Sequence, residues 1–244
     1  MHKLICLLLI YVATGSNSFA QHHIRLMTYN IRNAKGMDNK EDYDRTATVI
    51  KNANADIIAL QELDSATKRN GGEYALKILA EKTGLHFLFG AAISYQGGKY
   101  GVGILSKQKP LKYYTIPLPG KEEERVLLVA EFKKYVIFCL HLSLTDADRL
   151  TSVAIINVQA DHFTKPIYLL GDLNAEPASN AIAALKQKWT LLSGEDLTFP
   201  ADVPKKCIDY IFTLNNSKRI ISKKVIEEPL ASDHRPVLVE VDKK

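Results

Sequence analysis

Ile167-Tyr168-Leu169-Leu170-Gly171-Asp172-Leu173-Asn174-Ala175-Glu176-Pro177 is the segment from which the fold of this chain can be predicted. Its apolar start is typical of a short buried strand, and Gly171 is expected to permit a sharp turn after it. Pro177 suits the first turn of a helix over residues 178–188. Asp172 and Asn174 then stand at the C-terminal end of a buried strand, which suits a rigid catalytic site. Ordinary turns also favour Asp and Asn.

Apolar runs on either side of this segment predict further strands and helices. Strands are expected over residues 23–31, 56–61, 86–89, 101–106, 111–116, 125–132, 135–142, 208–214, 219–227 and 236–241. Helices are expected over residues 42–53, over residues 73–82 and after Thr145, the last with Leu150, Val153, Ala154 and Val158 on its buried side. Many strands with a few interspersed helices predict a mixed α/β sandwich with the helices outside.

The N-terminus has the pattern of a secretory signal peptide. Lys3 precedes a short apolar run over residues 4–12, and Ser18-Phe19-Ala20 places small residues at a cleavage site. We expect cleavage after Ala20 and a periplasmic or secreted protein, with one domain over residues 21–244. The alternative is an uncleaved anchor, but the apolar run is too short for a stable membrane span. We therefore expect no stable membrane insertion.

Composition sets wide limits on function. The chain has 32 Lys and Arg against 27 Asp and Glu, and this mild excess of positive charge permits an anionic substrate without requiring nucleic acid. Basic residues are dispersed, which is typical of a solvated surface. Cys139 and Cys207 remain after the signal peptide, and whether they pair is left open. We expect a monomer.

Polar residues recur where the predicted strands end. Each of them alone is compatible with an ordinary solvated strand end, whereas the complete set indicates a site. The candidate site residues are Asn30, Glu62, His141, Asp172, Asn174, Asp209, Asp233 and His234. Their carboxylate and amide oxygens suit Mg²⁺, with Mn²⁺ as the alternative ion. Histidines can transfer protons near neutral pH, and a carboxylate can orient one of them. Together these groups suit metal-assisted attack of water on a phosphate ester.

Five short motifs, in this order, resemble the endonuclease/exonuclease/phosphatase family, which has the deoxyribonuclease I-like fold. They are Thr28-Tyr29-Asn30, Gln61-Glu62-Leu63, Gly171-Asp172-Leu173-Asn174, Ile208-Asp209-Tyr210-Ile211 and Ser232-Asp233-His234-Arg235-Pro236-Val237. The resemblance implies an α/β fold, specifically a four-layer αββα sandwich of two mixed, mainly antiparallel sheets with helices outside. It places the site at one edge of the two packed sheets.

The resemblance also implies roles for the candidate residues. Glu62 is similar to the principal metal ligand, with Asn30 and Asp233 nearby. The resemblance implies that Asp172 positions or activates the attacking water, and that Asn174 holds a phosphoryl oxygen. In the same pattern His234, paired with Asp209, is a general base or a stabiliser of the transition state, and His141 binds phosphate.

One position departs from the family pattern. Some nuclease branches carry an acidic residue two places after the first asparagine, whereas this chain has Arg32 there. A second metal contact is therefore in question, and the alternative is that Arg32 faces an anionic substrate. Arg125 and Tyr100 are interpreted as a salt-bridge residue and a core aromatic, and the alternative is that they reach the substrate.

The expected function is hydrolysis of a phosphate ester, with a nuclease-like phosphodiesterase as the first hypothesis and nucleic acid as a possible partner. The alternatives are a phosphomonoesterase acting on inositol phosphates and a phospholipid phosphodiesterase similar to a sphingomyelinase. Family resemblance cannot choose among these substrates, because one scaffold carries many activities. A catalytically silent binding protein is the alternative from another class.

Overall fold

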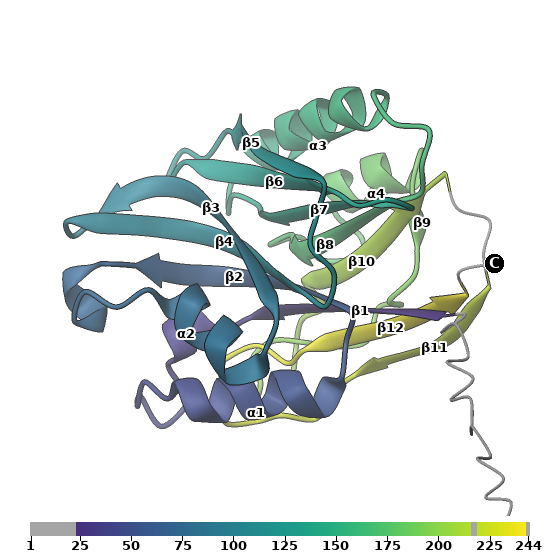
Figure 1. Cartoon of the computed structure of the whole chain (residues 1–244). Helices are drawn as coiled ribbons and strands as arrows, with labels where there is room; N and C mark the ends of the chain where they lie inside the picture. The colour runs from purple at the N-terminus through teal and green to yellow at the C-terminus, as the bar shows by residue number, and fades with distance from the viewer. Residues whose placement is uncertain (1–22, 216–218, 243–244) are drawn as a thin grey trace, which may run out of the picture.

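Two β-sheets stacked face to face form the centre of the molecule, and helices cover both outer surfaces (Figure 1). The structure is a computed structural model that describes residues 23–215 and 219–242. Helices α1 (Tyr43–Ala53) and α2 (Ala75–Thr83) lie on one side, and α3 (Asp146–Ala160) and α4 (Asn180–Lys186) on the other. The expected four-layer αββα sandwich is confirmed. The predicted signal peptide lies outside the described residues.

The first sheet has six strands in the order β11-β12-β1-β2-β4-β3. Strands β1 and β2 run parallel and are joined through α1, whereas the other neighbours in this sheet pair antiparallel. The bounds are β1 (His23–Asn30), β2 (Ile57–Ser65), β3 (His86–Tyr95), β4 (Gly98–Ser106), β11 (Ile220–Val225) and β12 (Val237–Asp242).

The second sheet also has six strands, in the order β5-β6-β7-β8-β10-β9. Its parallel pair is β7 and β8, joined through α3, and its other neighbours pair antiparallel. The bounds are β5 (Lys112–Leu118), β6 (Arg125–Glu131), β7 (Val136–His141), β8 (Ile167–Asp172), β9 (Thr190–Leu191) and β10 (Asp209–Leu214). Short 3-10 helices η1 (Arg32–Ala34) and η2 (Lys68–Asn70) complete the elements.

Alternation along the central strands explains the stacking. Because successive side chains point to opposite faces of a strand, an apolar run buries both faces of its sheet. In β8, Tyr168 and Leu170 enter the core between the sheets, whereas Ile167 and Leu169 pack toward α3 and α4. The same division holds in the first sheet, where alternate residues of β1 and β2 pack toward α1 and α2.

Two details of the segment from Ile167 to Pro177 differ from expectation. Gly171 makes no turn, because it belongs to strand β8. A Cβ there would lie 2.2 Å from the carbonyl oxygen of Leu140 on the neighbouring strand, so glycine permits close strand packing instead. The turn falls at Asn174, whose φ is +47°. Helix α4 starts only at Asn180, with Ser179 rather than Pro177 at its N-terminal boundary.

The buried face of α3 also differs from expectation. Leu150 and Val158 are exposed by 38% and 64%, whereas Val153, Ile156 and Ala160 are buried. Ser152 is buried on the same face. Because this face includes a polar residue, the spacing of apolar residues does not identify it correctly. Cys139 and Cys207 are both buried and free. No helix within residues 23–215 and 219–242 combines the length and apolar character that a membrane span requires.

Candidate active site

Strand ends from both sheets meet at one edge of the sandwich and carry the predicted site residues. Asn30 ends β1, His141 ends β7 and Asp172 ends β8. His141 and Asp209 both lie beside Asp172 in the strand register. The segment before β12 brings Asp233 and His234 to the same edge, because β12 runs antiparallel to β1. The topology thus gathers residues that are far apart in the sequence.

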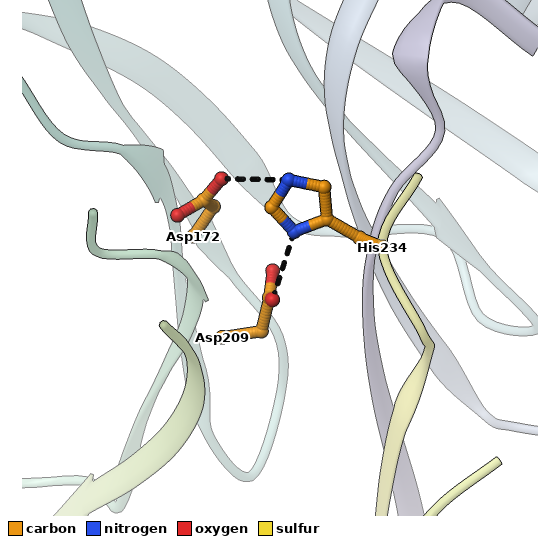
Figure 2. A group of neighbouring side chains, drawn as sticks. All are labelled: Asp172, Asp209 and His234. Atoms are coloured by element: carbon orange, nitrogen blue, oxygen red, sulfur yellow. Dashed lines mark hydrogen bonds and ion pairs between the residues drawn. The ribbon is translucent and has the colours of Figure 1, made fainter. Parts of the chain in front are cut away.

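Three side chains linked by one hydrogen bond and one ion pair lie at the centre of this edge (Figure 2). His234 Nδ1 lies 2.9 Å from Asp209 Oδ2, and His234 Nε2 lies 3.7 Å from Asp172 Oδ2. Burial disfavours the charged imidazole, but Asp209 and Asp172 more than offset this and raise the pKa of His234 to about 10. His234 is therefore an imidazolium at neutral pH, oriented by Asp209 with Nε2 turned toward Asp172.

His141 lies on the other side of Asp172 in a different environment. Its Nε2 is 3.4 Å from Asp172 Oδ2 and 2.9 Å from Asn174 Nδ2. Burial lowers the pKa of His141 to about 4, helped by the charges of Arg125 and His234 and opposed by Asp172. Since the amide of Asn174 is a donor, the neutral ring accepts through Nε2 and offers its proton at Nδ1.

Asn30 and Glu62 form the part of the site that belongs to the first sheet. Asn30 Nδ2 donates to Glu62 Oε1 at 3.0 Å and to Asp172 Oδ2 at 3.1 Å. A register shift in β2 follows Leu60, and Glu62 has a φ of +59°. Left-handed backbone at a non-glycine residue is strained and clusters at functional sites. Burial, with the nearby Asp233 and Asp172, raises the pKa of the Glu62 carboxyl.

Asp233 is held at the rim by the segment that precedes β12. Ser232 Oγ donates to the carbonyl oxygen of Asn30 at 2.7 Å, which ties this segment to the end of β1. The Asp233 carboxylate lies 3.5 Å from Arg32 Nε. The structure thus brings all eight predicted residues to one region, and it adds Arg32 and Ser232 beside them.

A cleft of about 650 Å³ opens over these groups. Several of its lining residues were not anticipated from sequence, among them Glu123, Arg149, Glu176, Ser179, Phe199 and Lys206. Phe199 packs on His234, with 4.8 Å between the ring centroids. Its loop gives no periodic or compositional signal that predicts this contact. Arg125 pairs with Glu122 and Glu123, as expected of a salt-bridge residue, yet it also lines the cleft with Tyr100.

The family model for the Endonuclease/Exonuclease/phosphatase family matches residues 27–234. The chain belongs to this family. Members of the endonuclease/exonuclease/phosphatase family are phosphoesterase hydrolases that generally depend on a divalent metal. No curated protein sequence gives a significant match.

Solved structures of the endonuclease/exonuclease/phosphatase family share the fold at low identity. One from Bacteroides vulgatus has a TM-score of 0.76 and 20% identity, covering 91% of this chain and 99% of its own. A mannosyl-6-phosphatase from Bacteroides thetaiotaomicron has a TM-score of 0.69 and 18% identity, with 89% and 99% covered. The human Nocturnin catalytic domain, with bound sulfate, has a TM-score of 0.69 and 18% identity, with 90% and 94% covered.

The donor set fits the divalent cation on which endonuclease/exonuclease/phosphatase enzymes depend. Within residues 23–215 and 219–242, the Glu62 carboxylate receives one hydrogen bond, from Asn30, although Asp172 and Asp233 add negative charge nearby. A divalent cation would offset that charge, and oxygen ligands suit a hard ion. Candidate ligand atoms of Asp172, Asp209 and His234 also lie within 4.8 Å of one another. Asp209 and His234 already form a hydrogen bond with each other, so we do not assign this group as the metal site.

Proposed function

We propose that the protein is a divalent-metal-dependent hydrolase of phosphate esters, acting as a nuclease-like phosphodiesterase. The observation that carries this proposal is the row of side chains Asp209, His234 and Asp172. Asn30 hydrogen-bonds to both Asp172 and Glu62, so the oxygen atoms of Asn30 and Glu62 lie beside this row. Binding alone does not require an oriented imidazolium beside a buried carboxylate. The pairing therefore supports an enzyme over a silent binding protein on the same fold.

The side chains suggest a division of labour in the reaction. Asp172 accepts a proton from the attacking water, while Asn30 and the backbone N–H of Asn174 hold its carboxylate in place. His234 presents a positive charge to the oxygens of the phosphoryl group as negative charge develops on them. The neutral His141 binds and orients the phosphate, and Asn174 fixes the position of its ring.

Glu62, Asn30 and Asp233 are the residues that would hold the metal, and Mg²⁺ is the ion we propose, with Mn²⁺ able to replace it. When bound, the ion would neutralise charge on the phosphoryl oxygens and on the leaving group. Burial raises the pKa of the Glu62 carboxyl, and this supports the assignment, because a cation beside the buried carboxyl would favour its charged form.

A specific observation favours a second candidate, a phosphomonoesterase acting on a small hydroxyl-rich substrate. Among the described residues that line the cleft, five are acidic and three are Lys or Arg. Such a lining disfavours a long polyanion, whereas carboxylates accept hydrogen bonds from hydroxyl groups. The mannosyl-6-phosphatase with this fold makes a sugar phosphate a reasonable member of any substrate panel.

We also propose that the protein works as a monomer outside the cytoplasm. The support for export is the signal-peptide pattern of residues 1–20. N-terminal sequencing of the mature protein from the cell that makes it would test the cleavage site, and a mature chain beginning at Met1 would contradict cleavage after Ala20.

The proposed activity is tested by hydrolysis of a substrate panel with Mg²⁺ and with EDTA. The panel contains plasmid DNA, bis-p-nitrophenyl phosphate, p-nitrophenyl phosphate, inositol polyphosphate, mannose 6-phosphate and sphingomyelin. We expect one class of substrate to be hydrolysed only in the presence of metal. The Glu62→Gln variant should be activated less well by metal, while its melting temperature stays nearly unchanged. Folded protein that hydrolyses nothing but still binds phosphate compounds would contradict the proposal and support a binding protein.

A further inference from the structure

An unusual backbone segment follows Asn30 directly. Arg32, Asn33 and Ala34 have φ values of +46°, +55° and +57°, so three successive residues with a Cβ atom adopt left-handed conformations. L-residues visit this region singly and seldom in succession. Such strain persists only where surrounding contacts over-determine it, and it concentrates at functional sites.

Contacts from distant parts of the chain hold this segment in place. Asn33 Oδ1 accepts a hydrogen bond from Arg69 Nη2 at 2.9 Å, and Arg69 also donates twice to the buried Asp64, at 2.6 and 2.9 Å. On the other side, the backbone N–H of Arg32 donates to Asn30 Oδ1 at 3.1 Å. The segment is thus anchored to the site at one end and to a buried ion pair at the other.

The result of this arrangement is a positive charge at the proposed metal site. Arg32 Nε lies 3.5 Å from Asp233 Oδ2, and the Arg32 side chain is 34% exposed. In the described part of the chain, Asp233 is the only hydrogen-bond or ion-pair partner of this guanidinium. The Arg32 side chain thus has one partner, at 3.5 Å, and N–H groups that remain free beside the proposed phosphate site. These N–H groups are the donors that a phosphate needs.

We propose that Arg32 is a substrate-binding residue that exchanges Asp233 for the substrate's phosphate when a divalent cation binds. In the metal-free protein the guanidinium pairs with Asp233, so an incoming cation has to compete with it for this carboxylate. A cation bound by Asp233 repels the guanidinium, which then binds the phosphate through its N–H groups. Arg32 therefore opposes metal binding in the absence of substrate and favours phosphate binding in its presence. This inference rests on the proposed function.

The exchange gives Arg32→Gln a signature in which two affinities move in opposite directions. Titration of Mn²⁺ into EDTA-treated protein, followed by calorimetry, should show about threefold tighter binding, because a competing charge is gone. Titration of inorganic phosphate into Mg²⁺-saturated protein should show about tenfold weaker binding, a typical effect of losing a charge-assisted hydrogen bond. Arg32→Lys should recover part of the phosphate affinity, since its charge remains but its fork geometry is lost.

Arg45→Gln is the matched control. Arg45 forms an ion pair with Asp38 at 3.0 Å, so this variant removes the same charge from an Arg–Asp pair that contains none of the proposed metal ligands. We expect both of its affinities to equal those of the wild type. All variants should keep the wild-type circular dichroism spectrum.

Two results would overturn the assignment of Arg32. If Arg32→Gln weakened both Mn²⁺ and phosphate binding, the side chain would only support the site, and if neither affinity changed, it would take no part in binding. In both cases wild-type binding and turnover remain, so the proposed function survives. Wild-type protein with neither Mn²⁺ binding nor turnover would instead overturn the proposed function together with this inference.

Discussion

His141 and His234 are both buried and both lie beside Asp172, yet their pKa values are shifted in opposite directions. The pKa of His141 is lowered to about 4 and that of His234 is raised to about 10. Burial disfavours the charged ring at both positions. The difference is that Asp209 contacts His234 at 2.9 Å, whereas the amide of Asn174 contacts His141 at the same distance. The second, hydrogen-bonded carboxylate of Asp209, rather than depth in the protein, decides which histidine carries charge.

The largest effect on activity is expected from His234→Ala. Loss of the charged ring removes both the stabilisation of the transition state and the partner of Asp172, so turnover should fall by about 10² or more. Steady-state kinetics on the best substrate of the panel would measure this. Asp209→Asn should cause a smaller loss, because the ring stays but its pKa falls. A much lower melting temperature for His234→Ala would indicate that this histidine is mainly structural.

A smaller loss, of about tenfold, is expected from His141→Asn. The neutral ring acts as a hydrogen-bonding group, and an asparagine amide can replace part of that function. Kinetic comparison with His234→Ala at several pH values would measure the difference. Equal losses for the two variants would break the comparison, since they would imply that charge does not distinguish the two histidines.

The pH dependence of stability, as distinct from activity, is also expected to separate the two histidines, because their contributions have slopes of opposite sign. His234 binds its proton more tightly in the folded state than its unfolded pKa of about 6.5 implies, so its stabilisation is complete below pH 6.5 and is lost as pH rises toward 10. His141 binds its proton less tightly when folded, so stability is lost as pH falls from 6.5 toward 4.

Thermal melts of EDTA-treated protein between pH 4 and pH 10 would measure both slopes, since each kcal/mol shifts the melting temperature by about 2–4 °C. The melting curve of His234→Ala should lack the alkaline slope that His234 contributes. The curve of His141→Asn should lack the acid slope that His141 contributes. Slopes of the same sign for the two residues would contradict the assigned pKa directions.

The sequence predicts the framework of the site well because its signals are local. The apolar run before Asp172 and the one before Glu62 each predict a buried strand that ends in an acidic group. Both strands are observed, although β2 continues to Ser65. The layers follow from the order of strands and helices and from the family resemblance, and the structure confirms them.

Features set by distant contacts could not be predicted in this way. The left-handed run at Arg32 depends on Arg69, which follows 37 positions later and reaches Asn33 only in the folded chain. The contact of Phe199 with His234 arises from a loop without periodicity. The opposite pKa shifts of the two histidines depend on which side chain faces each ring, and strand-end residues carry no such information in their spacing. The catalytic roles assigned to these residues stay predictions.

The site straddles the seam between the two sheets, because Asn30 and Glu62 come from one sheet and His141, Asp172 and Asp209 from the other. The proposed activity should therefore depend on the position of one sheet relative to the other. Displacement of one sheet by about 1 Å would leave every strand intact, yet misplacement of that size can lower a rate by about 10²-fold. Substitutions in the core between the sheets, such as at Cys139, are thus expected to lower the proposed activity while the secondary structure stays whole.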